Sequence, residues 1–127
     1  METVYLDTHV VVWLFAGEVH KLSPRAIERI ETGDLLISPM VLLELEYLRE
    51  IGRITYPHET IIGSLSKSID LNVCDLLFVD VTREAIRHTW TRDPFDRMIV
   101  AQAALQKSSI LLSRDRNIRQ HYLRAEW

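Results

Sequence analysis

The chain has 127 residues, of which 47% are hydrophobic and 26% charged, as in an ordinary globular domain. Its formal net charge of −3 argues against a general attraction to nucleic acids. The longest apolar run, Val10 to Ala16, is too short to cross a bilayer, and the single cysteine, Cys74, cannot form an internal disulfide. We therefore expect one domain over residues 1–127, in the cytoplasm and without membrane association.

The hydrophobic pattern predicts strands and helices in alternation. Strands are expected at residues 3–7, 34–38, 76–81 and 109–113, with a possible edge strand within 122–127. Helices are expected at residues 9–16, 24–31, 39–52, 58–70 and 82–90, then from Pro94, and in a last short segment after residue 115. This alternation predicts an α/β sandwich, with a mostly parallel central sheet and helices on both faces.

Two acidic residues follow predicted strands. Asp7 ends the first strand, and Asp115 follows the strand SILLS. Because ligands of open α/β sheets bind outside the carboxyl ends of the strands, both side chains are expected at one edge of the sheet. Either aspartate could also be a simple helix cap, as Asp7 with Thr8 would be.

Glu44 lies on the expected inner face of a helix. Helical spacing places it on the stripe of Val41, Leu45, Leu48 and Ile51, while the helix begins directly after the strand 34–38. A buried carboxylate among apolar neighbours is costly unless it is paired or bound to a metal. Glu44 is therefore either a partner of an arginine or a third acid at the carboxyl edge.

The segment RDPFDRMIVAQA supplies a fourth acid. Asp93 followed by Pro94 is typical of a helix N-cap, and Asp96 then falls in the first helical turn. On the following turns, Ile99 and Val100 belong to an apolar stripe that would pack on the sheet. Asp96 can therefore join the other three acids.

Converging carboxylates repel one another, and a cation removes that repulsion. Oxygen ligands without a Cys or His cluster favour Mg²⁺ or Mn²⁺, and the five histidines show no metal-ligand spacing. Such a centre is suited to hydrolysis of phosphodiesters. Arginines crowd into the same part of the chain, either as solvated ion pairs or as a phosphate-binding patch, and the candidates are Arg92, Arg97, Arg114 and Arg116.

The segments LDTHVVVWL, SPMVLLEL, RDPFDRMIVAQA and LLSRD together resemble PIN-domain ribonucleases, most closely the VapC-type toxins of toxin–antitoxin pairs. The resemblance implies a PIN-like three-layer sandwich and cleavage of RNA, often tRNA or ribosomal RNA, with one or two Mg²⁺ or Mn²⁺ ions. It also implies a homodimer and inhibition by a cognate antitoxin that lies in a groove near the active site. The catalytic and metal-binding residues that it implies are Asp7, Glu44, Asp96 and Asp115.

Three further residues are expected to support these acids: Ser113, Thr8 and Asp93. Ser113 would hydrogen-bond a water on the metal or a phosphate, and Asp93 would mainly cap its helix. Asn117 stands where a further acid sometimes occurs in the family, which leaves the number of metals open.

Other functions fit the sequence less well. A phosphatase of the haloacid-dehalogenase kind needs a second aspartate at position 9, which is His9, and a response-regulator receiver needs an acid after the middle strand, where Ser38 stands. A nuclease outside any toxin pair and a catalytically silent PIN-like binding domain remain open. The aromatic residues at helical spacing are expected in the core or in an interface: Trp13, Phe15, Trp90 and Phe95.

Overall fold

The computed structural model describes all residues from 1 to 127 and has a central sheet of five parallel strands in the order β3-β2-β1-β4-β5. The strands are β1 (Thr3–Leu6), β2 (Asp34–Ile37), β3 (Asn72–Val73), β4 (Ile110–Leu112) and β5 (Ala125–Glu126). In the register of the central strands, Val4 of β1 lies between Leu35 of β2 and Ile110 of β4. The expectation of a mostly parallel sheet is confirmed.

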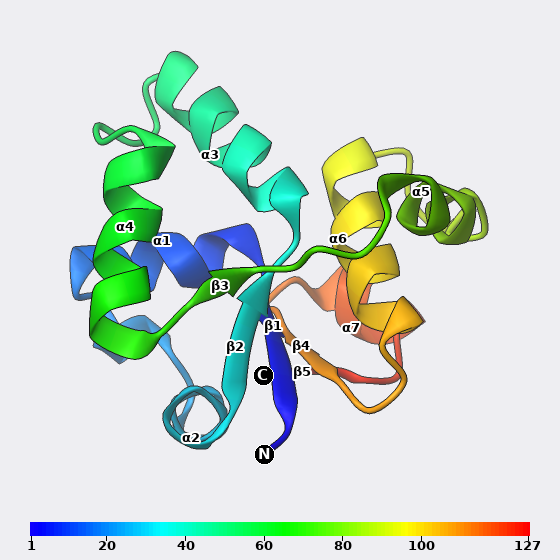
Figure 1. The fold of residues 1–127 in the computed structure, drawn as a ribbon, viewed down its shortest axis with the longest axis horizontal. Coiled ribbons are helices and arrows are strands. Elements are labelled where there is room, and N and C mark those ends of the chain that lie inside the picture. The colour runs from blue at the N-terminus through cyan, green and yellow to red at the C-terminus, as the bar shows by residue number, and fades with distance from the viewer.

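Seven α-helices and one short 3₁₀-helix connect the strands. They are α1 (Thr8–Ala16), η1 (Val19–Lys21), α2 (Pro24–Thr32), α3 (Pro39–Glu50), α4 (His58–Ile69), α5 (Phe78–Ile86), α6 (Pro94–Leu105) and α7 (Arg116–His121). Figure 1 shows α1 and α4 on one side of the sheet and α6 and α7 on the other, which makes the predicted three-layer sandwich. None of these helices is long and apolar enough to cross a membrane.

The helix starts follow from local sequence. Three helices begin with a proline in the first turn, directly after a capping residue: Ser23, Ser38 and Asp93. In each case the capping side chain accepts a hydrogen bond from a backbone N–H of the first turn, and proline needs no such partner. These starts agree with the positions that the sequence predicts.

The core lies between the sheet and its two helical layers. Val4 and Leu6 of β1 are fully buried, as are Val10 and Val11 of α1. The stripe predicted for α6 is also buried, since Ile99 is 1% exposed and Val100 is inaccessible. Burial of this apolar surface fixes the sheet against the helices that carry the acidic residues.

One predicted strand is wrong. Residues 76–81 do not form a strand, because α5 begins at Phe78 and continues to Ile86. Val81 and Ala85, four residues apart, are buried in a small cluster with Met98 of α6, whereas Phe78 is 68% exposed. This spacing of buried residues is helical, and it overrides the β-type composition of the segment.

Two smaller expectations also differ from the structure. Ile51 is 50% exposed instead of facing the core, because α3 ends at Glu50 and Ile51 is already its C-cap. The two-residue strand β3 pairs with β2 and has no signal of its own in the sequence. The possible edge strand near the C-terminus is confirmed as β5.

Gly33 permits the close approach of α2 to β1. A Cβ atom at this position would lie 2.5 Å from Val4 Cγ2 and 2.9 Å from the carbonyl oxygen of Arg29. Gly33→Ala should therefore lower the free energy of unfolding by about 1–3 kcal/mol, measured by urea denaturation. Gly63→Ala is the matched control, because nothing lies within 4 Å of its Cβ on the exposed face of α4, and it should stabilise by about 0.5–1 kcal/mol. Equal effects of the two changes would contradict this packing.

Candidate metal centre

The predicted acids converge in one pocket of about 440 Å³ outside the carboxyl ends of the strands. Five of its lining residues are acidic, and they come from four separate parts of the chain. The lining residues are Asp7, Thr8, His9, Val12, Trp13, Glu44, Leu48, Arg53, Ile54, Asp93, Asp96 and Asp115. The predicted position of the quartet at this edge of the sheet agrees with the structure.

Asp7 is the most buried of these acids, with 4% of its surface exposed. It follows β1 and caps α1, and its Oδ1 accepts a hydrogen bond from the Thr8 backbone N–H at 2.8 Å. The Ser113 hydroxyl donates to Oδ2 at 2.6 Å. Because β1 and β4 are adjacent, this bond fixes the carboxylate between two neighbouring strand ends.

Ser113 connects two of the predicted acids. It is fully buried, and besides donating to Asp7 it accepts a hydrogen bond from the Asp115 backbone N–H at 3.1 Å. Asp115 then caps α7, since its Oδ1 accepts from the backbone N–H groups of Asn117 and Ile118 at 2.8 and 3.2 Å. The serine was expected to contact a water or a phosphate, and in the structure it orients the acids themselves.

Glu44 extends from α3 into the pocket and is half-buried. The hydroxyl of buried Thr8 donates to its Oε1. Burial raises the pKa of Glu44, the Thr8 hydrogen bond opposes that shift, and the charges of Asp7 and Asp93 add to it. No arginine pairs with Glu44, so the alternative of a buried Glu–Arg ion pair does not apply.

Asp96 is the most strained acid in electrostatic terms. Burial, followed by repulsion from Asp93, Asp7, Asp115 and Glu44, raises the pKa of Asp96 to about 7. No hydrogen bond to its carboxylate offsets the shift. A half-buried carboxylate without a donor and with four acids near it is the arrangement that a bound cation relieves.

Asp93 caps its helix and also lines the acidic pocket. Its Oδ1 caps α6 by accepting from the backbone N–H groups of Phe95 and Asp96, at 2.8 and 3.2 Å. It is exposed, and it lines the same pocket as the quartet.

His9 lies in the pocket, although no role for it is evident from the sequence. Its Nε2 accepts a hydrogen bond from the Arg114 backbone N–H at 2.9 Å, which places the ring proton on Nδ1, 3.6 Å from Asp7 Oδ2. Burial lowers the pKa of His9, although Asp7 and Asp115 oppose this shift. Through the Nε2 hydrogen bond, the ring joins the start of α1 to the loop after β4.

The predicted phosphate-binding arginines differ in their positions. Arg97 donates to the carbonyl oxygen of Ile86, and Arg92 donates to that of Thr89. Arg114 lines a shallow hollow beside the pocket, together with His9, Trp13 and Asp115. Arg116 lines neither the pocket nor this hollow.

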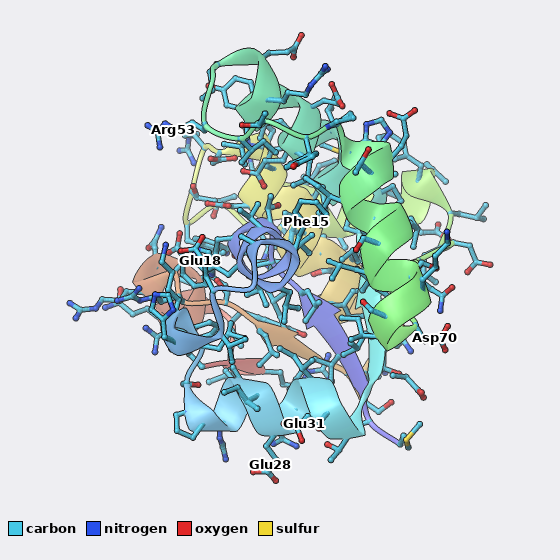
Figure 2. All side chains as sticks on the ribbon, turned by 90° about the vertical axis from the view of Figure 1, so that its left-hand side faces the viewer. Phe15, Glu18, Glu28, Glu31, Arg53 and Asp70 are labelled. Carbon is cyan, nitrogen blue, oxygen red and sulfur yellow. The ribbon has the colours of Figure 1, made fainter.

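Arg53 is a basic residue of the pocket that sequence reasoning missed. It lies in the loop between α3 and α4, is exposed and forms no ion pair. It also lines an adjoining apolar groove with Phe15 and Glu18, and Figure 2 labels all three. Its position depends on the loop after α3, which helical periodicity does not describe.

The oxygen ligands of the pocket fit Mg²⁺ or Mn²⁺. Its acidic side chains offer carboxylate oxygens, and Nε2 of its one histidine already accepts the Arg114 backbone N–H. No three of these acids have ligand oxygens within 4.8 Å of one another, so binding of one ion by three of them requires side-chain movement or bridging water.

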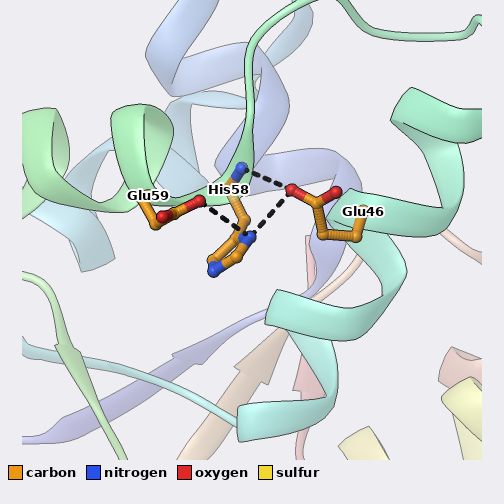
Figure 3. Close-up of side chains that lie close together, drawn as sticks. All are labelled: Glu46, His58 and Glu59. Carbon is orange, nitrogen blue, oxygen red and sulfur yellow. Dashed lines mark hydrogen bonds and ion pairs between the residues drawn. The ribbon is translucent and has the colours of Figure 1, made fainter.

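A second group, made of Glu46, His58 and Glu59, has ligand atoms within 4.8 Å of one another (Figure 3). Glu46 Oε1 accepts from the His58 backbone N–H at 3.1 Å and lies 2.8 Å from its Nδ1. Arg49 lies 3.5 Å from the other oxygen of Glu46. These contacts cap the start of α4 and join it to α3, so the group is explained without a metal.

A parallel sheet with an acidic pocket at its carboxyl edge defines the class of protein, an α/β fold with a candidate metal centre. The sequence model of the PIN domain matches residues 4–122, and the chain belongs to the PIN domain family. No curated protein sequence matches it.

Three solved structures share the fold at low sequence identity. A chain of VapBC2 from Rickettsia felis, bound to a DNA fragment from its promoter, has a TM-score of 0.68 at 15% identity, covering 98% of this chain and 97% of that one. A chain of DNA-bound VapBC from Salmonella typhimurium has a TM-score of 0.64 at 18% identity, and the match covers 99% of this chain and 98% of that one. A chain of VapBC-1 from nontypeable Haemophilus influenzae has a TM-score of 0.58 at 17% identity, and the match covers 98% of this chain and 96% of that one.

The raised pKa of Asp96 predicts a pH-dependent effect of Asp96→Asn on the metal-free protein. The carboxyl binds its proton more tightly in the folded state, so its unfavourable contribution is absent below pH 4, grows between about pH 4 and 7, and is complete above pH 7. Asp96→Asn should therefore raise the free energy of unfolding by about 1–3 kcal/mol at pH 8 and by much less at pH 4.

Denaturant unfolding in EDTA at both pH values measures this difference. Glu31→Gln is the control, because Glu31 is exposed on α2 and forms no ion pair. A gain of the same size at pH 4 and pH 8 would show that removal of charge repulsion is not the cause.

Proposed function

We propose that this protein is a divalent-metal-dependent endoribonuclease, the toxin of a toxin–antitoxin pair that acts in the cytoplasm. The observation that supports this most is Asp96, a half-buried carboxylate with no hydrogen-bond donor and with four further acids around it. Membership of the PIN domain family supports nuclease chemistry, and the fold shared with chains of VapBC complexes supports the toxin role.

In this proposal Asp7, Asp96 and Asp115 hold Mg²⁺ or Mn²⁺, and Glu44 acts as a further ligand or positions the attacking water. A bound ion would neutralise the acids and supply the Lewis-acid chemistry of phosphodiester hydrolysis. Ser113 and Thr8 orient Asp7 and Glu44 through hydrogen bonds. Glu44 Oε2 has no partner in the protein, which leaves it free to orient water.

RNA is the proposed substrate, with structured RNAs such as tRNA or ribosomal RNA as its class. Although the net charge is −3, five of the 18 acidic residues line the pocket, where a bound cation would offset their charge. Arg53 and Arg114 lie at the pocket and in its adjoining hollow, and neither forms an ion pair with a carboxylate. In this proposal they contact backbone phosphates that flank the cleaved one.

We propose that the cognate antitoxin occupies the apolar groove next to the pocket. The groove has a volume of about 430 Å³ and includes Phe15, Tyr56 and Ile61. It shares Arg53 with the acidic pocket, as well as Val12 and Ile54. A segment bound in the groove would therefore cover the pocket rim and hinder the access of RNA.

The proposed homodimer would bury apolar side chains that the isolated chain exposes. Leu43 and Tyr47 of α3 and Ile51, the C-cap of that helix, follow one another at intervals of four residues and are 56%, 48% and 50% exposed. Helix α5 adds a second such surface with Phe78 and Ile86. Contiguous exposed apolar side chains of this kind are typical of interfaces.

Replacement of the acids should abolish cleavage without unfolding the protein. Asp7→Asn and Asp96→Asn should each lower the rate of tRNA or ribosomal RNA cleavage in Mg²⁺ or Mn²⁺ by at least about 100-fold, and Ser113→Ala by about 10- to 100-fold. Gel assays with EDTA as the metal-free reference measure the rates, and Asp80→Asn on exposed α5 is the control. Undiminished cleavage by the Asp7 or Asp96 variant would refute the proposal.

A charge in the apolar groove should release the enzyme from its inhibitor. Phe15→Lys should weaken binding of the protein encoded by the adjacent reading frame at least about tenfold, while cleavage of RNA continues. Calorimetry with the co-expressed partner measures the affinity. Leu123→Lys, at a side chain that is 99% exposed and lies outside the groove, should leave that affinity unchanged. Unchanged affinity in Phe15→Lys would contradict binding of the partner in the groove.

A further inference from the structure

Trp13 lies on α1 at the rim of the acidic pocket, although its sequence context predicts a core or interface residue. It is half-buried and packs partly against the core. It also lines the acidic pocket and the adjoining hollow of about 350 Å³ that contains Arg114 and Asp115. The indole therefore lies at a surface that connects directly with the candidate metal centre.

The aromatic neighbours of Trp13 do not stack on its ring. His9 lies 5.0 Å away at an interplanar angle of 59°, and Trp127 lies 5.9 Å away at 61°. Trp90 differs, because His121 stacks on it at 5.2 Å with an angle of 4°. At Trp90 a parallel ring, that of His121, stacks on the indole. At Trp13 neither His9 nor Trp127 stacks in this parallel way.

Two cations lie over the ring of Trp13. Lys21 Nζ is 5.5 Å from the ring centroid, and Arg114 Cζ is 5.9 Å from it. Lys21 also contacts Glu18 at 2.6 Å, whereas Arg114 has no carboxylate partner. An aromatic ring with cations close to it is the combination that binds single-stranded nucleic acids, since the ring stacks on a base and the cations contact phosphates. A base would take the place of the exposed Arg114 side chain over the ring, and the guanidinium would move to a phosphate.

We propose that Trp13, with Arg114 and Lys21, forms a stacking subsite for an unpaired nucleobase next to the cleaved phosphodiester. This inference rests on the proposed ribonuclease function and adds a specificity-determining residue to it. Asp115 lines both the hollow and the acidic pocket, so a base on Trp13 would be close to a phosphate held at the acids. The enzyme would then require an unstacked nucleotide at its cleavage site, as in a loop or a bulge.

Binding of short RNA tests the subsite separately from cleavage. The probes are fluorescein-labelled octaadenylate RNA and an abasic ribose-phosphate oligomer of the same length, with anisotropy measured in the Asp96→Asn protein. This protein should bind the octaadenylate about tenfold more tightly than the abasic oligomer, and adding Trp13→Leu should remove that preference. Trp13→Phe should retain most of it, and Trp90→Leu should retain all of it.

A fluorescence measurement tests the same subsite with Trp13 in place. The chain has three tryptophans, so the double variant Trp90→Phe/Trp127→Phe leaves Trp13 as the only tryptophan, which is excited selectively at wavelengths that tyrosine does not absorb. Octaadenylate should quench its emission in EDTA, and the abasic oligomer should quench it much less. Equal quenching by both probes, or none, would overturn the proposal.

The outcomes separate this inference from the nuclease proposal. Metal-dependent cleavage that fails in Asp7→Asn, together with a base preference that Trp13→Leu leaves unchanged, would overturn the stacking subsite alone. A base preference that disappears in Trp13→Leu would support the subsite, even if the Asp7→Asn protein still cleaved RNA and the nuclease proposal failed.

Discussion

Repulsion among carboxylates in a partly buried pocket is the constraint on which the rest of this structure depends. Five acids from four parts of the chain line the same 440 Å³ space. The fold tolerates them because hydrogen bonds hold most of these side chains, through helix N-termini or through the hydroxyls of Thr8 and Ser113. Asp96 has no such donor, so its charge is the one that most requires an external cation.

The parallel sheet explains how this concentration of charge is assembled. Each of β1, β2 and β4 is followed within a few residues by a helix whose capping residue, Asp7, Ser38 or Asp115, lies just outside the carboxyl end of the strand. Two of these caps are also site acids, so the hydrogen bonds that begin a helix position the candidate ligands. The apolar core beneath them, including Leu6 and Leu112, fixes the strand ends and limits how far the acids can separate.

The sequence predicts the features that arise from local rules. Capping motifs locate the starts of α2, α3 and α6, and the rule for open sheets brings Asp7 and Asp115 to one edge. It does not predict features that depend on tertiary contacts. Residues 76–81 have a composition that fits a strand or a helix, and their packing on α6 decides for the helix. The contact of His9 with Arg114 and the position of Arg53 depend on where loops return, which no periodicity encodes.

Anomalous scattering from a crystal grown with Mn²⁺ would test the central claim most directly. The account predicts an anomalous peak among Asp7, Asp96 and Asp115, at a position where water completes the coordination. A peak at Glu46, His58 and Glu59 without one in the acidic pocket, or no peak at saturating Mn²⁺, would contradict it.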